Sequence, residues 1–198
     1  EYNRFSQQAK TLQKFLLNKF TKQNQYKMMV ESILNEKVMV VNKEELPKVS
    51  IITSVFRGGD YIEGFMKDIV RQTIFDHCEL ILVHPKNSPD FEKEKEVIQP
   101  YLNKYSNIIY KVLEEDRGLY HCWNVGVEMS TGEYLGNRNL DDRLCVNQLE
   151  KCAKELYLNP NIGGVYFDFW ITNKANETYE NNSANGRRYS FPEFSFEI

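Results

Sequence analysis

From residue 47 onward, short apolar runs alternate with longer segments in which apolar residues recur at helical spacing. Residues 49–56, 80–83 and 108–113 are rich in β-branched and aliphatic side chains, which favour strands. Residues 62–70 instead place apolar side chains at i, i+3, i+4, i+7 and i+8, the pattern of an amphipathic helix. This alternation predicts an α/β domain with a mainly parallel central sheet and helices on both of its faces.

The same alternation continues to residue 170. The run at 80–83 is apolar without interruption, as expected for a strand buried on both faces of a parallel sheet. The polar tract 173–188 is predicted to be a loop. Further helices are predicted at 90–104, 120–130 and 146–156, and further strands at 133–137 and 163–170.

Residues 1–46 differ from the rest of the chain, because they are rich in Lys, Gln and Asn and contain neither Gly nor Pro. Apolar residues recur at helical spacing on both sides of a polar break at residues 21–25. This pattern predicts an N-terminal helical segment. Two interpretations stay open: a helical hairpin packed on the main domain, or a connector to a partner domain of the same protein.

The bulk composition excludes several kinds of partner. The net charge of −3 gives no electrostatic reason to expect a nucleic acid or an anionic membrane. No apolar run approaches the roughly 18 to 20 residues of a transmembrane helix, so no transmembrane segment is predicted. Reduced buried thiols are the favoured interpretation of the cysteines and indicate a cytoplasmic protein. The four cysteines, which form no CxxC pair and lack the His spacing of a zinc site, are Cys78, Cys122, Cys145 and Cys152.

Two adjacent carboxylates, Asp141 and Asp142, follow shortly after the predicted strand 133–137. Oxygen ligands at the carboxyl end of a strand suit a hard divalent cation, which usually brings phosphates with it. Open α/β sheets bind their ligands at this same edge. The pair therefore points to an enzyme of phosphorylated or nucleotide-linked substrates. The alternative is that both residues cap the helix that follows Arg143.

An ordered series of short motifs gives residues 48–170 a family resemblance. Together they resemble the family 2 glycosyltransferases of the GT-A fold. This resemblance implies a nucleotide-sugar-binding domain over residues 47–198 that stops before its acceptor side is complete. The motifs are the strand 49–56, Gln72-Thr73, residues 79–83, Glu115-Asp116-x-Gly118-x-Tyr120, Asn124-x-Gly126, Thr131-Gly132-Glu133-Tyr134 and Asp141-Asp142.

The resemblance implies a donor held over the carboxyl ends of the first strands. Thr53, Ser54, Phe56 and Arg57 would then flank the nucleobase, since an aromatic face beside exposed backbone groups suits a flat heterocycle. For Phe56 alone, a place as the last core residue of the strand is an equal alternative. Asp116 would contact the nucleoside, and the alternative is that it caps the helix that follows.

At the end of the second strand the sequence departs from the family. Members commonly carry an Asp-Asp-Gly-Ser type loop whose acidic residue contacts the base, whereas this chain has His84-Pro85-Lys86-Asn87-Ser88. His84 is the candidate replacement acceptor, and Lys86 is the candidate contact to a phosphate. For each, the alternative is an incidental loop residue. The missing carboxylate weakens the case for a uridine nucleotide.

The family's Asp-x-Asp motif corresponds to Asn139-Leu140-Asp141 in this chain. The resemblance implies that Asp141 ligates Mn²⁺ or Mg²⁺, which would bridge the two phosphates of the donor. Asn139 keeps an oxygen and loses a charge, so it would contact the ribose or ligate weakly. Asp142 would either support the metal ligand from behind or lie on the acceptor side, and it is the candidate for a catalytic role, which is otherwise unassigned. No acidic motif after Trp170 identifies the general base that an inverting enzyme needs.

The resemblance implies a glycosyltransferase that moves a sugar from a nucleotide-sugar donor to an acceptor hydroxyl, with metal assistance and inversion. The acceptor stays open among carbohydrates, lipid-linked molecules and proteins. Two alternatives remain. One is a nucleotidyltransferase on a related scaffold. Such enzymes carry a Gly-rich loop that binds phosphate after the first strand, and Arg57-Gly58-Gly59 matches that loop only weakly. The other is a non-catalytic module that binds nucleotide sugars.

Overall fold

The computed structural model describes residues 41–184 and 188–190. Residues 1–40, most of the predicted N-terminal helical segment, lie outside these described residues. Residues 41–46 pack with the main domain: Val41 and Leu46 are buried in its core, on either side of a 3₁₀ helix, η1 (Lys43–Glu45). The predicted division of the chain after residue 46 stays a prediction.

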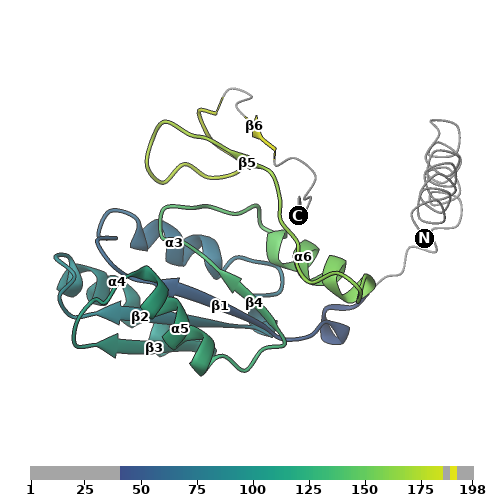
Figure 1. The fold of residues 1–198 in the computed structure, drawn as a ribbon. Helices are drawn as coiled ribbons and strands as arrows, with labels where there is room; N and C mark the ends of the chain where they lie inside the picture. Colours follow the sequence, from purple (N-terminus) through teal and green to yellow (C-terminus); the bar gives the residue numbers. More distant parts are fainter. Residues whose placement is uncertain (1–40, 185–187, 191–198) are drawn as a thin grey trace, which may run out of the picture. The chain divides into compact units, whose positions relative to one another are not determined.

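The central sheet is parallel, with strand order β3-β2-β1-β4 (Figure 1). The predicted ends of these strands and helices differ from the observed ends by at most two residues. Among the described helices, none has both the length and the apolar character needed to cross a membrane. The strands are β1 (Val49–Ser54), β2 (Cys78–Pro85), β3 (Ile108–Leu113) and β4 (Tyr134–Asn137). The helices are α3 (Ile62–Ile69), α4 (Phe91–Lys104), α5 (Leu119–Met129) and α6 (Gln148–Leu158), with a 3₁₀ helix η2 (Phe75–His77) before β2.

Apolar side chains cover both faces of β1 and β2 because these strands lie inside the sheet. Side chains alternate between the faces: Ile51 packs in the larger core cluster with residues of α3 and α4, and Ile52 packs in the smaller cluster with Cys122 of α5. Helix α5 approaches β1 closely, since a Cβ on Gly126 would lie 2.3 Å from Ile52 Cγ2. The predicted cover on both faces is confirmed, with α5 on one face and α3 and α4 on the other (Figure 1).

The predicted strand at 163–170 is wrong for most of its length. Only Phe169–Trp170 form a strand, β5, which pairs antiparallel with β6 (Arg188–Tyr189) and does not join the central sheet. Residues 163–168, Asp168 included, form no helix or strand. Two glycines at the start of this segment lose much backbone entropy on ordering, and the residues after them are mostly exposed, so burial does not offset that cost.

A buried carboxylate joins three segments at the amino edge of the sheet. Glu79 of β2 is 3 % exposed and accepts hydrogen bonds from Ser50 Oγ (2.5 Å) and Lys48 Nζ (2.5 Å). It also accepts from the backbone N–H (2.6 Å) and the hydroxyl (2.8 Å) of Thr131. Ser50 Oγ in turn accepts the N–H of Gly132 at 2.8 Å. These bonds hold the entry to β4 against β1 and β2.

Candidate functional site

A cleft of about 330 Å³ opens at the carboxyl edge of the sheet, and we call it the carboxyl-edge cleft. Its walls come from the loops that follow β1, β3 and β4, which are far apart in the sequence. Parallel strands bring these loops to one edge. Six residues singled out in the sequence line the cleft: Ser54, Phe56, Arg57, Asp116, Asn139 and Asp141.

The loop after β1 is held by the consecutive backbone N–H groups of residues 57–59. Arg57 takes a left-handed conformation, with φ 54°, and its guanidinium lies 5.3 Å from the centre of the Phe56 ring. Positive φ is uncommon for residues other than glycine, and such residues concentrate at functional sites. The loop therefore presents Phe56 and Arg57 to the cleft in a fixed arrangement. The acceptors of the three N–H groups are Ser88 Oγ (3.0 Å), Glu94 Oε1 (2.6 Å) and Asp90 Oδ2 (3.3 Å).

His84 lies inside the protein and does not line the cleft. Strand β2 extends to Pro85, so His84 is a fully buried strand residue and not a loop residue. Its Nδ1 pairs with the Tyr110 hydroxyl and its Nε2 with Glu94 Oε2, both at 2.8 Å. Both ring nitrogens are occupied within the protein, which corrects the expectation that His84 contacts a nucleobase. His84 instead holds Glu94, which binds the N–H of Gly58.

Glu94 is a fully buried carboxylate on α4. Burial disfavours its charged form, but hydrogen bonds from His84, the Gly58 N–H and Ser88 outweigh burial and hold the pKa of Glu94 below its ordinary value. The charged carboxylate is a stronger acceptor than a neutral group, which suits its role as the anchor of the loop after β1.

Three further residues singled out in the sequence lie outside the carboxyl-edge cleft. Thr53 is fully buried in β1, and its hydroxyl has no hydrogen-bond partner among the described residues. Lys86 pairs with Glu114 Oε1 at 2.7 Å. Asp142 lines a neighbouring cavity, and its Oδ2 accepts a hydrogen bond from Asn139 at 3.2 Å.

The loop after β4 contacts the loop after β1 through Leu140. Leu140 is 7 % exposed, and a Cβ on Gly58 would lie 2.1 Å from its Cδ1. The guanidinium of Arg143 holds the same turn by donating to the Leu140 carbonyl oxygen at 2.7 Å. Because Leu140 stands between Asn139 and Asp141, its packing against Gly58 sets where these two polar side chains lie.

Replacing Gly58 by alanine is expected to lower the free energy of unfolding by about 1 to 3 kcal/mol, the usual cost of overpacking a close contact. The new Cβ would displace Leu140, whose burial leaves it little room. Urea unfolding followed by circular dichroism measures the change. Gly163→Ala is the matched control, because a Cβ there meets nothing within 4 Å. Equal unfolding midpoints for the two variants would contradict the proposed contact.

The carboxylate of Asp141 is suited to a metal that arrives with a substrate. Asp141 is exposed and makes no hydrogen bond or ion pair within residues 41–184 and 188–190. In the same part of the chain, no group of three or more His, Cys, Asp or Glu side chains could hold a metal. A divalent ion at Asp141 would therefore take most of its ligands from phosphates and water, the usual arrangement for Mg²⁺. The residues present fit an ion bound in this way.

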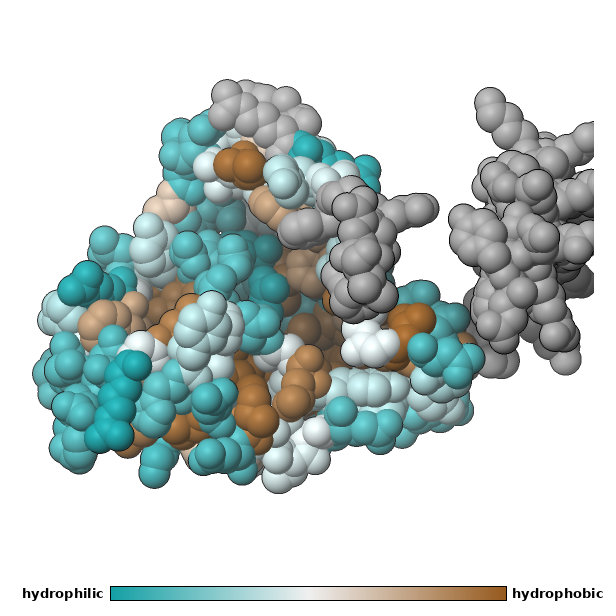
Figure 2. Space-filling view, viewed as in Figure 1, coloured by the Kyte–Doolittle hydropathy of each residue, from teal (hydrophilic) through white to brown (hydrophobic). Residues whose placement is uncertain are grey.

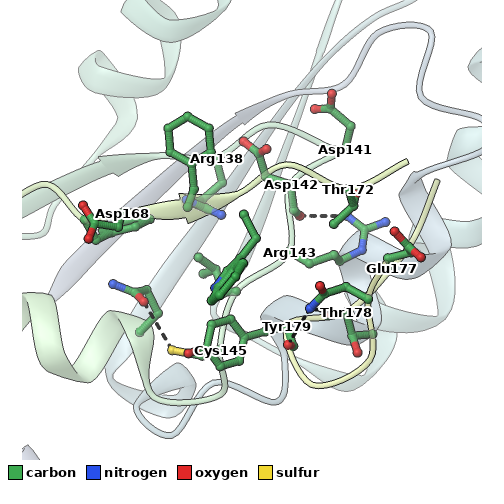
Figure 3. Close-up of a pocket in the computed structure, with 16 residues that line it drawn as sticks. Arg138, Asp141, Asp142, Arg143, Cys145, Asp168, Thr172, Glu177, Thr178 and Tyr179 are labelled. Carbon is green, nitrogen blue, oxygen red and sulfur yellow. Dashed lines mark hydrogen bonds between the residues drawn. The ribbon is translucent and has the colours of Figure 1, made fainter. Parts of the chain in front are cut away.

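A second cavity, of about 340 Å³, shares Asp141 with the carboxyl-edge cleft. Figure 3 shows Arg138, Asp142 and Asp168 among the residues that line it. Because the two spaces meet at Asp141, a ligand in one would lie beside a ligand in the other. Aromatic side chains also line the second cavity: Phe167, Phe169, Trp170 and Tyr179.

A third cavity, of about 680 Å³, runs along β4 and α6 and is largely apolar. β4 is the outermost strand of the described sheet on this side. Figure 2 shows apolar surface in the hollow between β4 and α6. Sequence reasoning assigned no role to this groove. Its apolar lining includes Tyr134, Leu135, Leu149, Leu156 and Ile162.

Sequence reasoning missed three residues that shape the site: Glu94, Leu140 and Arg138. Glu94 stands in a charged helix and resembles its solvent-facing neighbours, so no local signal marks it. Leu140 had a signal, because it is the single apolar residue between Arg138 and Arg143. Arg138 also had a signal: it is a charged residue that lies between the predicted strand 133–137 and the candidate site residue Asn139.

The chain matches the family model described as glycosyl transferase family 2 over residues 50–197. It is 26 % identical over 124 residues to an uncharacterised glycosyltransferase of Methanocaldococcus jannaschii, covering 62 % of this chain and 42 % of that protein. It is 28 % identical over 107 residues to TuaG of Bacillus subtilis, a putative teichuronic acid biosynthesis glycosyltransferase, covering 53 % and 40 %. The chain thus spans less than half the length of these relatives.

Solved structures share the fold. The mannosyltransferase PcManGT from Pyrobaculum calidifontis, in complex with GDP-Man and Mn²⁺, has a TM-score of 0.54 at 18 % identity, over 75 % of this chain and 42 % of that one. TarS of S. aureus, in complex with UDP-GlcNAc, has a TM-score of 0.52 at 20 % identity, over 57 % and 32 %. At these identities the likeness shows the fold alone. It confirms the predicted α/β, GT-A-like fold.

Proposed function

Since the chain belongs to glycosyl transferase family 2, we propose that it moves a sugar from a nucleotide-sugar donor to an acceptor hydroxyl. The observation that carries this proposal is the carboxyl-edge cleft, where loops after three separate strands bring six singled-out residues together. Its volume of about 330 Å³ falls within the range of small-molecule sites. The carboxyl-edge cleft is the proposed donor site.

In the proposed donor site, Phe56 and Arg57 lie against the base and Asp116 lies against the nucleoside. Asp116 Oδ1 accepts the N–H of Gly118 at 2.8 Å, and the N–H of Asp116 donates to Asn87 Oδ1 at 2.7 Å. These two bonds fix the turn before α5. The other carboxylate oxygen of Asp116, Oδ2, is then left to accept a hydrogen bond from the nucleoside.

The proposed transfer is a substitution at the anomeric carbon of the donor sugar. A bond forms between the acceptor oxygen and that carbon while the bond from the carbon to the diphosphate oxygen breaks. The electron pair of the broken bond leaves with the nucleoside diphosphate, and the hydroxyl proton passes to a base. Attack from the face opposite the leaving group inverts the configuration. Asp142 is the proposed base among the described residues, because it lines the second cavity beside Asp141.

Asp141 is the proposed ligand of a divalent ion, Mn²⁺ or Mg²⁺. When bound, the ion would supply positive charge to the diphosphate as negative charge develops there. The complex of PcManGT with GDP-Man and Mn²⁺ supports this assignment, as does the exposed and unpartnered state of Asp141 among the described residues.

The relatives support a nucleotide-sugar donor without fixing which one, since PcManGT is in complex with GDP-Man and TarS with UDP-GlcNAc. The family match gives no support to nucleotidyl transfer. A non-catalytic nucleotide-sugar-binding module stays the second candidate, because His84-Pro85-Lys86-Asn87-Ser88 replaces the acidic loop that family members commonly carry after the second strand.

Thermal unfolding with UDP, GDP and ADP, each with and without Mn²⁺, tests the proposed donor site. We expect one nucleoside diphosphate to raise Tm, and to raise it further with Mn²⁺, since a ligand at 100 times its Kd stabilises the native state by about 2.7 kcal/mol. If none of the three nucleotides raises Tm, with or without Mn²⁺, the proposal is overturned.

Product analysis separates the candidate functions once a nucleotide binds. Hydrolysis of the matching nucleotide sugar in the presence of Mn²⁺ supports an enzyme. Binding without hydrolysis supports the non-catalytic module. Release of pyrophosphate from a nucleoside triphosphate would instead support nucleotidyl transfer.

A further inference from the structure

The guanidinium of Arg138 lies where the second and third cavities meet. Arg138 follows β4 directly, and its backbone N–H donates to the Ile52 carbonyl oxygen at 2.9 Å, so its main chain continues the sheet. The residue is partly buried and lines both the second and the third cavity, but not the carboxyl-edge cleft.

Arg138 is a cation without a partner in the part of the chain that the structure describes. A guanidinium carries five N–H donors, and none of those of Arg138 makes a hydrogen bond or ion pair with a described residue. Burial lowers the pKa of Arg138, and Asp142 and Asp68 oppose this from beyond hydrogen-bond distance. The side chain nevertheless stays charged at neutral pH. A partly buried charge without a partner is costly, so an anionic ligand is the natural complement.

The carboxylates near Arg138 have other partners. Asp68 forms an ion pair with Arg71 at 3.0 Å and accepts the N–H of Leu144 at 2.9 Å. Asp168, on the wall of the second cavity, pairs with Arg188. Asp142 accepts a hydrogen bond from Asn139, as described above. None of the three neutralises Arg138 directly.

The neighbouring arginine shows the contrast. The guanidinium of Arg143 donates to three carbonyl oxygens, those of Leu140 (2.7 Å), Asp142 (2.8 Å) and Tyr61 (3.0 Å), and also to the side chain of Asn176. These N–H donors of Arg143 already have acceptors in the protein, and the bonds hold the turn after β4. Arg138 thus remains the arginine of the second cavity with donors to offer a ligand.

We propose that Arg138 binds an anionic group of the acceptor, a phosphate or a carboxylate, in the second cavity. This rests on the proposed function, because it names the class of acceptor. The planar guanidinium matches two oxygens of such a group at once. The donor diphosphate is the less suitable partner, since Arg138 does not line the carboxyl-edge cleft. The aromatic side chains on the cavity wall provide an apolar surface for the rest of the acceptor.

The position of the second cavity fits an acceptor of this kind. It contains Asp141 and Asp142 as well as Arg138, so one molecule in this cavity could place a hydroxyl near the two carboxylates and an anion at the guanidinium. The acceptor class is therefore a hydroxylated compound with a nearby phosphate or carboxylate, such as a polyol phosphate or a uronic acid.

Direct binding to the full chain tests the proposal, with glycerol 3-phosphate, glucuronate and glucose as probes. Ligand-observed NMR in the presence of the preferred nucleoside diphosphate and Mn²⁺ gives the affinities of wild type and Arg138→Gln. We expect glycerol 3-phosphate or glucuronate to bind wild type at least tenfold more tightly than Arg138→Gln. Glucose affinity should be equal in both proteins. Lys151→Gln, an exposed residue of α6 that lines none of the three cavities, is the control for net charge.

The arms of this experiment separate the outcomes. Preference for glycerol 3-phosphate identifies a phosphate acceptor, and preference for glucuronate identifies a carboxylate acceptor. Anion binding that is absent in wild type, or equal in wild type and Arg138→Gln, overturns the proposal. Nucleotide affinity is measured on the same samples. If Arg138→Gln loses nucleotide affinity by the same factor as anion affinity, Arg138 belongs to the donor site, and the proposal is overturned. Failure of the proposed function is distinct, because wild type would then bind no nucleotide.

Stability of the unliganded protein gives a second readout. Because Arg138 has no partner among the described residues, Arg138→Met is expected to leave Tm unchanged or to raise it. A Tm lowered by several degrees would show that the guanidinium stabilises the fold. That result would contradict the proposal that it serves ligand binding.

Discussion

Asp141→Ala is expected to lower kcat/KM for turnover of the nucleotide-sugar donor by roughly 100-fold or more, equivalent to about 2.7 kcal/mol of transition-state stabilisation. Asp141 and Asp116 are the carboxylates of the carboxyl-edge cleft, and Asp116 already spends one oxygen on the turn before α5. Loss of Asp141 would remove the proposed metal ligand. The fold should be unaffected, because Asp141 has no partner among the described side chains.

Calorimetry with the preferred nucleoside diphosphate, with and without Mn²⁺, measures this effect independently of turnover. The variant should lose the part of the affinity that depends on Mn²⁺ and keep the rest. Asp76→Ala is the matched control, because Asp76 lies in η2 at the other edge of the sheet and pairs with Lys43. If nucleotide affinity responds to Mn²⁺ in Asp141→Ala as in wild type, the metal assignment is wrong.

Glu79→Gln is expected to lower the free energy of unfolding by about 3 kcal/mol at neutral pH. Burial disfavours the charged form of Glu79, but hydrogen bonds from Lys48, Ser50 and Thr131 outweigh burial and lower its pKa from 4.5 to about 2. Glutamine accepts with a single oxygen and carries no charge. It would leave the Lys48 ammonium unpaired and would turn N–H groups toward the donors of Thr131.

The pH dependence follows from the sign of this shift. The pKa of Glu79 is lower in the folded protein than in the unfolded chain, so its contribution to stability is complete above about pH 4.5. The contribution falls as pH decreases toward the folded pKa of about 2. The difference in unfolding free energy between wild type and Glu79→Gln should therefore shrink between pH 5 and pH 2.

Urea unfolding at a series of pH values measures this difference. Glu63→Gln is the control, because Glu63 is an exposed helix residue that pairs with Lys67 one turn away. Exposed pairs contribute little, so this variant should unfold at nearly the wild-type midpoint. A difference between wild type and Glu79→Gln that stays constant from pH 7 to pH 2 would show that the carboxylate charge does not matter.

The sequence was most informative where local pattern and fold agree. The continuous apolar run at 80–83 identified β2, because a strand buried on both faces has no polar side to alternate. The β-branched residues of 49–56 identified β1. Six residues of the carboxyl-edge cleft were identified through the family resemblance, and they lie together because parallel strands end at a common edge. Where a residue's position depends only on its place along one strand, the sequence was enough.

Sequence reasoning failed where position depends on contacts across the chain. His84 was expected in a loop, but β2 runs two residues further than predicted, to Pro85, and buries His84 against Glu94 and Tyr110. The bond between Glu94 and Gly58 joins residues 36 positions apart, which no local pattern marks. The strand expected at 163–170 has four aromatic residues and one valine, but propensity alone does not form a strand without a pairing partner.

The contact between Gly58 and Leu140 has a consequence for protein engineering. It means that the loop after β1 and the loop after β4 cannot be exchanged independently between family members. In a grafted loop, a side chain at position 58 would collide with Leu140, which is next to the proposed metal ligand in the sequence. Loop transplantation that aims to change the preferred nucleobase of the donor should therefore transfer positions 58 and 140 together.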